Sequence, residues 1–273
     1  MKIIEQYISG KTASLNNCED AIFISSDFAS VIDGATNLTW KKKKEKPGKL
    51  SSKIIMKALS VMPRKIASRK AIDFLTNALN EYYEREGIKE RLKNNPERRC
   101  ASSVIIYSQY RKEIWMVGDC QCLIGRKHYQ NKKNIDHLLS ELRSFFIMFE
   151  LNSGANISDI ARHDAGREAI ELFLKIQSSF QNNKKTTCFS YGAIDGFYVP
   201  TKYITELPVS FETDIVLASD GYPKLYSSLK KSEDYLKKLL AIDPLMFKVH
   251  PSTKGLVDGD LSYDDRAYIK IHV

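Results

Sequence analysis

Hydrophobic positions form short apolar runs in some parts of the chain and helical periodicity in others. Short apolar runs bounded by polar residues predict β-strands at 1–9, 20–25, 28–32, 102–107, 113–117, 121–124, 213–218 and 267–273. Apolar residues at helical spacing predict helices from Ser51 onward, over about 66–83, through much of 135–180 and over 232–240. Strands and helices in separate runs indicate an α+β fold in which helices cover sheet layers.

The three predicted strands between 102 and 124 follow one another through short connections, a polar turn at 109–112 and the pair Gly118-Asp119. Such a meander favours an antiparallel sheet. We find no internal repeat and no flexible linker, so we expect a single domain over residues 1–273. No apolar run approaches the roughly 20 residues of a membrane helix, and the N-terminus does not resemble a signal peptide. We therefore expect a cytoplasmic protein without a membrane partner.

The charge of the chain is positive, with 42 Lys+Arg against 33 Asp+Glu in 273 residues and a formal net charge of +9. The overall composition is that of a globular protein and excludes collagen-like and wholly disordered classes. The densest basic stretch, 41–49, contains Pro47 and Gly48 and predicts a solvated loop, with a platform for an acidic or phosphorylated partner as the alternative. No zinc-finger, helix-turn-helix or RNA-recognition signature accompanies it, which argues against a nucleic-acid partner.

The five cysteines form no regular framework. An odd number argues against a disulfide scaffold. Cys120 and Cys122 are two residues apart, which on a strand places them on one face and does not match a zinc ribbon. We interpret them as small core residues.

Acidic residues at strand ends are the informative feature. They occur in Glu19-Asp20, Asp33-Gly34, Gly118-Asp119, Ser219-Asp220-Gly221 and Asp264-Asp265. Taken singly, each is most simply a turn or a cap. If several converged, their carboxylates would repel one another unless a cation lay between them. Oxygen ligands alone select Mg²⁺ or Mn²⁺ over zinc.

This ordered set resembles the metal-dependent protein phosphatases of the protein phosphatase 2C type, and in particular their compact single-domain bacterial members. Those proteins carry a Glu-Asp box, an apolar strand ending in Asp-Gly, a Gly-Asp-Ser junction, a Ser-Asp-Gly motif and a terminal Asp-Asn. The corresponding elements here run in the same order from residue 19 to residue 265. The resemblance implies a four-layer αββα sandwich, two stacked antiparallel β-sheets flanked by helices, with two divalent metal ions at one edge.

The resemblance also implies roles for individual residues. Asp33 would bridge both metals, Gly34 would offer its backbone carbonyl to one of them, and Asp220 and Asp264 would hold the other. Glu19 and Asp20 would act mainly through metal-bound waters, and Asp119 would bind a weaker third metal. With two Mn²⁺ or Mg²⁺ ions as cofactors, the expected activity is hydrolysis of phosphoserine or phosphothreonine on a phosphorylated protein by a metal-activated water.

Two departures concern the substrate phosphate. The position of the family's phosphate-binding Arg is Leu15, and Lys11 is the nearest basic residue before it. We therefore take Lys11 as the candidate phosphate ligand. The residue after Asp33-Gly34 is Ala35, where many members have a His that can protonate the leaving group. Water or another side chain, such as His137 or His163, would have to replace it.

Two further departures concern the metals. The position of the family's second ligand for the third metal is Lys224, whose ammonium could replace that cation near Asp119, so we expect only two metals. Asp265 replaces the terminal Asn and would either strengthen metal binding or face solvent. These changes leave alternatives open: a weakly active binding or regulatory module, a two-metal phosphatase for a small phosphate ester, or nucleic-acid binding through the basic loop. The oligomeric state and the physiological substrate are not predicted.

Overall fold

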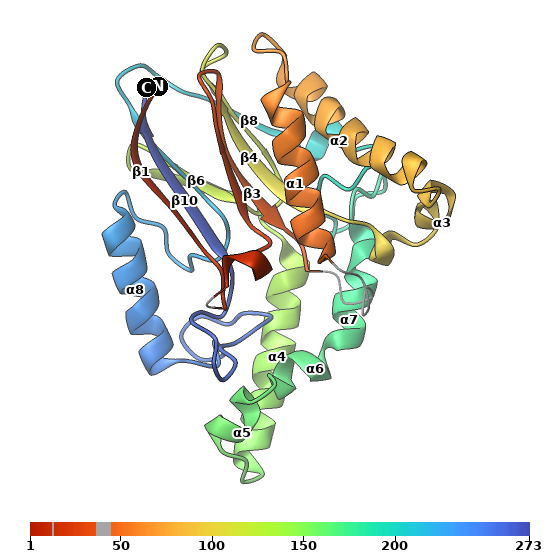
Figure 1. Cartoon of the computed structure of the whole chain (residues 1–273). Helices are drawn as coiled ribbons and strands as arrows, with labels where there is room; N and C mark the ends of the chain where they lie inside the picture. The colour runs from red at the N-terminus through yellow and green to blue at the C-terminus, as the bar shows by residue number, and fades with distance from the viewer. Residues whose placement is uncertain (13, 37–44) are drawn as a thin grey trace.

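The computed structural model describes residues 1–12, 14–36 and 45–273, which form two stacked antiparallel sheets (Figure 1). The first sheet has the order β1-β10-β9-β6-β7, formed by Lys2–Ser9, Arg266–His272, Asp214–Ala218, Gln121–Ile124 and Lys127–Gln130. The second has the order β2-β3-β4-β5-β8, formed by Ala21–Ile24, Phe28–Gly34, Ser102–Ser108, Glu113–Val117 and Thr205–Pro208. The predicted α+β class with antiparallel sheets is confirmed.

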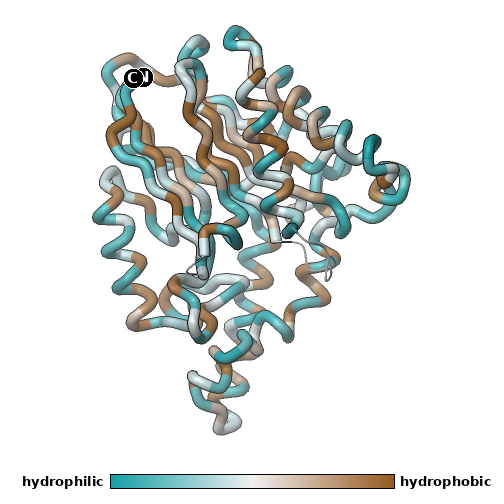
Figure 2. The backbone as a smooth tube through the Cα atoms, in the orientation of Figure 1, coloured by the Kyte–Doolittle hydropathy of each residue, from teal (hydrophilic) through white to brown (hydrophobic). Residues whose placement is uncertain are grey.

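The main core lies between the two sheets. Alternation along β4 shows how it forms, because Ile105 and Tyr107 point toward the other sheet while Val104 and Ile106 point outward. All four are buried, and long stretches of the strands are coloured as hydrophobic in Figure 2. Cys120 and Cys122 lie in the inter-sheet core as predicted, whereas Cys188 is exposed.

Helices cover both outer faces and complete the four layers. Helices α1 (Pro47–Ser60) and α2 (Ser68–Arg85) pack on the outward face of the second sheet, with Ile55, Leu59 and Leu75 in a shared core. Helix α8 (Leu229–Ile242) and the segment before it cover the first sheet. A short helix α3 (Lys89–Lys93) follows α2. The four-layer αββα arrangement implied by the resemblance is thus the observed one.

A helical insertion extends from one end of the sheets. It comprises α4 (Asn134–Asn152), α5 (Ile157–Ala161), α6 (Ala165–Ala169) and α7 (Glu171–Ile176). In Figure 1 these helices lie below the sheets, at the end where the loop that precedes β10 also lies. None of the helices within the described ranges has both the length and the apolarity needed to cross a bilayer.

The predicted three-stranded meander is wrong in its third strand. β4 and β5 are neighbours, but β6 pairs with β7 and β9 in the other sheet. The chain crosses between sheets at Gly118, whose φ of +87° favours glycine. A Cβ there would also overlap the Ser103 side chain. This crossing sets Asp119 at the junction of the two sheets.

The start of α1 also differs from the prediction. The prediction begins this helix at Ser51, but it already begins at Pro47, where the missing N–H of proline is tolerated. Pro47 and Gly48 are therefore helical and not part of a loop. Gly48 packs against Gly34, and a Cβ on either would overlap the other's backbone. Of the predicted basic loop 41–49, residues 47–49 belong to α1 and residues 41–44 lie outside the described residues.

Candidate metal centre

The antiparallel registers bring distant carboxylates to one end of the sandwich. Asp33 at the end of β3 pairs with Ser103 at the start of β4, and β5 ends next to them before Asp119. In the other sheet, Asp220 follows β9 and Asp264 precedes β10 at the same end. Carboxylate oxygens of Asp33, Asp119 and Asp220 all lie within 4.8 Å of one another. Three strand ends separated by about a hundred residues therefore converge.

These carboxylates are crowded and poorly solvated. Burial raises the pKa of Asp33 well above its usual range, and repulsion from Asp20, Asp119 and Asp264 adds to this effect. Burial likewise raises the pKa of Asp220, with Asp33 as the next contributor. Such a cluster holds its negative charges at neutral pH only when cations share the site.

The donor set fits hard divalent ions. Asp20 Oδ2 and Glu19 Oε1 are buried and have no hydrogen-bond partner among the described residues. Buried carboxylate oxygens without a hydrogen-bond partner destabilise the folded protein unless a cation or water binds them. Every acidic ligand in the cluster offers oxygen, which suits Mg²⁺ or Mn²⁺. The residues present therefore fit the metals that the resemblance implies.

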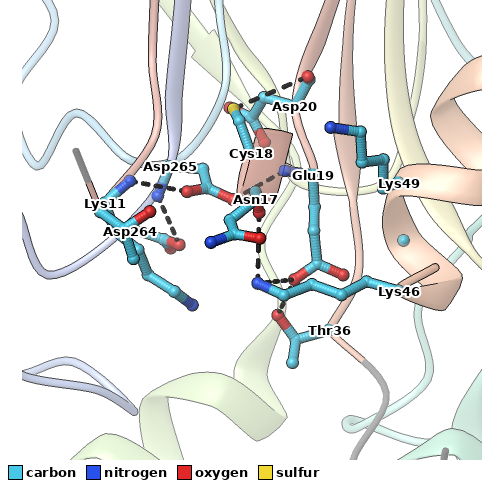
Figure 3. Close-up of polar contacts among 12 residues, drawn as sticks. Lys11, Asn17, Cys18, Glu19, Asp20, Thr36, Lys46, Lys49, Asp264 and Asp265 are labelled. Carbon is cyan, nitrogen blue, oxygen red and sulfur yellow. Dashed lines mark hydrogen bonds and ion pairs between the residues drawn. The ribbon is translucent and has the colours of Figure 1, made fainter. Parts of the chain in front are cut away.

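The predicted metal ligands lie around a cavity of about 110 Å³. Its lining includes the predicted residues Asp20, Asp33, Gly34, Asp119, Asp220 and Asp264. Glu19 is also buried beside this group, where the Thr36 hydroxyl donates to Oε2 at 2.8 Å and Lys46 Nζ lies 3.8 Å from the same oxygen (Figure 3). The sequence thus selected a set of acidic residues that meet in space. Their individual roles as ligands stay predictions.

Lys11, the predicted phosphate ligand, is placed differently. It is not among the residues that line the carboxylate cavity. Its backbone N–H donates to Asp265 Oδ1 at 2.7 Å. Burial lowers the pKa of its ammonium, and the neighbouring Lys254 lowers it further. Leu15 is 58% exposed, so the position equivalent to the family's Arg points to solvent.

Asp265 lines the carboxylate cavity but does not face solvent. It is buried, and both its oxygens accept backbone hydrogen bonds, Oδ1 from Lys11 and Oδ2 from Glu19 at 2.8 Å (Figure 3). The alternative in which Asp265 faces solvent is therefore wrong, whereas its effect on metal binding stays a prediction. Asp265 instead ties the segment that follows β1 to the Glu19-Asp20 box.

Changing Asp265 to Asn is expected to destabilise the protein by about 1–3 kcal/mol, because an amide has one acceptor oxygen and would turn its NH₂ toward one of the two N–H donors. Chemical unfolding in EDTA measures this. Asp258→Asn, at an exposed position, is the matched control and should change the free energy of unfolding by less than about 0.5 kcal/mol. Equal stability of the two variants would contradict the structural role of Asp265.

An ammonium does lie beside Asp119, but it belongs to Lys133. Lys133 Nζ lies 3.5 Å from Asp119 Oδ2 and 2.9 Å from Asp136 Oδ2. Although burial opposes ionisation of Asp119, Lys133 and the Ser103 hydroxyl outweigh it and hold the pKa of Asp119 below its usual value. Lys224 instead lies over the rings of Tyr226 and Tyr235, 5.2 and 5.7 Å from their centroids. The expectation of an ammonium beside Asp119 therefore holds, but the residue that supplies it is Lys133 and not Lys224.

A second lysine enters the cluster from the loop before β10. Lys254 Nζ pairs with Asp264 Oδ2, and its side chain is 23% exposed. Burial alone would lower its pKa, but Asp264 and Asp220 together raise it above the usual value. Sequence reasoning missed Lys133 and Lys254 because neither lysine lies in a recognisable motif. No local signal marks either one.

A larger cavity of about 500 Å³ adjoins the carboxylates. Asp119, Asp220, Asp264, Lys133 and Lys254 line both cavities. His137 lines the larger one, whereas His163 is 55% exposed and lies 3.6 Å from Glu168. Of the two histidines considered as a source of a proton, only His137 is on a cavity wall next to the site.

Comparison with solved structures agrees with this architecture. The Mycobacterium tuberculosis serine/threonine phosphatase PstP/Ppp superposes with a TM-score of 0.50 at 12% identity, covering 99% of this chain and 98% of that one. The catalytic domain of the serine threonine protein phosphatase PstP in complex with 2 manganese ions gives 0.50 at 11% identity, covering 97% and 95%. No protein-family model and no curated protein sequence matches the chain. The chain thus has the protein phosphatase 2C-type fold, as the sequence motifs predicted.

Proposed function

We propose that this protein is a Mg²⁺- or Mn²⁺-dependent phosphatase that hydrolyses phosphoserine or phosphothreonine esters on proteins. The observation that carries the proposal is the convergence of Asp33, Asp119 and Asp220 within 4.8 Å from three separate strand ends. The fold shared with PstP, which is described as a serine/threonine phosphatase with manganese bound, supports it. The whole chain is proposed to act as one domain, since the acidic residues come from positions 19–265.

The residues of the chain have distinct tasks in this proposal. Asp33, Asp220 and Asp264, with the carbonyl of Gly34, would hold two metal ions, and Glu19 and Asp20 would order water around them. When bound, the ions would lower the pKa of water and neutralise phosphoryl charge. The Lys133 ammonium already neutralises Asp119, so we propose two metals and no third. His137 lines the cavity where a leaving group would depart, as His250 also does, and we propose it as the replacement for the proton donor absent at Ala35.

The substrate is proposed to be a phosphorylated protein because the larger cavity opens beside the carboxylates and can admit an extended side chain. A small phosphate ester is the alternative substrate, and a weakly active regulatory module is the alternative function. The acidic cluster argues against a regulatory module, because buried carboxylates that repel one another would serve no purpose in a site without catalysis.

Hydrolysis of p-nitrophenyl phosphate and of a phosphothreonine peptide, each with Mn²⁺, Mg²⁺ or EDTA, tests the proposal. We expect turnover with either metal and none in EDTA. Faster hydrolysis of the peptide than of small esters at equal concentration would support a protein substrate. Absence of metal-dependent turnover on every ester would contradict the enzymatic function and favour the binding module.

A further inference from the structure

A phosphate dianion in the carboxylate cavity would be oriented by a basic side chain of the protein in addition to the proposed metal ions. Among the described residues, the basic side chains that line it are Lys133, Arg167 and Lys254. Lys133 is held by two carboxylates and also lies 4.7 Å from the centroid of the Tyr191 ring. Arg167 donates from Nη1 to the Thr253 carbonyl at 2.9 Å. Lys133 is therefore engaged with two carboxylates, and Arg167 is anchored to the backbone next to Lys254, where its remaining N–H donors could support the same phosphate.

Lys254 has a different environment. Its ammonium pairs with Asp264, which is also an expected metal ligand. A carboxylate shared with a divalent cation offers less charge to the lysine, and like charges repel, so the ammonium becomes available for another anion. Lys254 lines both the carboxylate cavity and the larger cavity beside it. Its flexible four-carbon stem allows the ammonium to turn toward a phosphoryl oxygen between the two.

The backbone around Lys254 is fixed from both sides by the helical insertion. Arg143 of α4 donates from Nη1 to the Ser252 carbonyl at 3.2 Å, and the Gly255 N–H donates to Asp164 Oδ2 at 2.8 Å. Arg167 of α6 holds the carbonyl of Thr253, as described above. Arg143 and Asp164 are themselves a buried ion pair at 2.7 Å. Such an arrangement fixes the position of the lysine while leaving its side chain able to move.

We propose that Lys254 is the residue that binds the substrate phosphoryl group, and that the Arg143–Asp164 pair positions it from the helical insertion. This inference rests on the proposed phosphatase function. Leu15 occupies the position of the family's phosphate-binding Arg, and Lys254 is assigned that task instead. It replaces Lys11, whose ammonium does not line the carboxylate cavity. A lysine is a suitable phosphate ligand because it acts as a compact point charge with three donors.

The test uses Lys254→Met, Lys254→Arg, Lys11→Met and the control Lys248→Met, an exposed lysine in the same loop. Kinetics with p-nitrophenyl phosphate and calorimetric titration of the Mg²⁺-loaded protein with inorganic phosphate are compared. We expect Lys254→Met to lose about tenfold or more in kcat/KM and in phosphate affinity, whereas Lys254→Arg keeps most of both. Lys11→Met and Lys248→Met should stay within about twofold of the wild type.

A separate Mg²⁺ titration distinguishes phosphate binding from a structural role. Lys254→Met should bind Mg²⁺ as tightly as the wild type or more tightly, because a competing cation is gone. Unchanged phosphate affinity in this variant, or a loss explained by equally weakened Mg²⁺ binding, would overturn the inference. Circular dichroism checks folding, and Lys254→Gln is used if the Met variant does not fold. If the wild type hydrolyses no ester, the proposed function fails, while phosphate titration still decides the role of Lys254.

Discussion

Asp33→Asn is expected to remove metal-dependent hydrolysis while making the metal-free protein more stable. Asp33 lies within 4.8 Å of two other carboxylates, and its negative charge is disfavoured by burial and by its neighbours. The nearly isosteric amide removes one of the repelling charges, so we expect the free energy of unfolding in EDTA to rise by about 1 kcal/mol or more. Loss of a proposed metal ligand should reduce turnover about a hundredfold or more.

The two effects are measured on the same samples. Chemical unfolding in EDTA and in saturating Mg²⁺ gives the stability of each form, and p-nitrophenyl phosphate hydrolysis gives the activity. The wild type should be stabilised by Mg²⁺ through ligand linkage, and Asp33→Asn should gain little. Asp258→Asn, at an exposed position, should match the wild type in all three measurements. A variant that is inactive but destabilised in EDTA would show that Asp33 is mainly structural.

The acidic half of the site could be predicted from the sequence because each motif is local and their order resembles that of the protein phosphatase 2C type. Each carboxylate follows or precedes a short apolar run, and antiparallel strands return to the same end of a sandwich. Asp33, Asp119 and Asp220 therefore meet even though the chain crosses between sheets at Gly118, which was not predicted. Neither the strand Lys127–Gln130 nor Thr205–Pro208 was predicted, because edge strands with exposed residues lack an apolar run.

The basic half of the site could not be predicted in this way. Lys133 and Lys254 acquire their roles only when α4 and the loop before β10 fold back on the sheet ends, and nothing near either residue signals this. The role of Asp265 could not be predicted either, because it also depends on contacts with residues distant in the chain. Its match to a family motif suggested a metal ligand or a solvent-exposed residue, but its contacts are two backbone N–H groups from residues far away in the chain.

Arg143→Met is expected to destabilise the protein by about 3–5 kcal/mol, the largest stability change among these variants. Arg143 is fully buried and donates to Asp164 Oδ1 from Nε and Nη2 at 3.1 and 2.7 Å. Its Nη1 also donates to the Leu245 carbonyl at 2.8 Å. Removing the guanidinium leaves a buried carboxylate without its cation and carbonyls without their donor. Thermal and chemical unfolding of the metal-free protein measure the loss.

A double-mutant cycle with Asp164→Ala shows whether the charge pair is responsible. The Arg143→Met/Asp164→Ala protein should be less destabilised than the sum of the single variants, because it no longer buries an unpaired charge. Arg64→Met, at an exposed position, should change stability by less than about 0.5 kcal/mol. Additive effects would mean that Arg143 acts through its carbonyl contacts alone. Since Arg143 and Asp164 each hydrogen-bond the loop that carries Lys254, phosphate affinity should fall in both single variants.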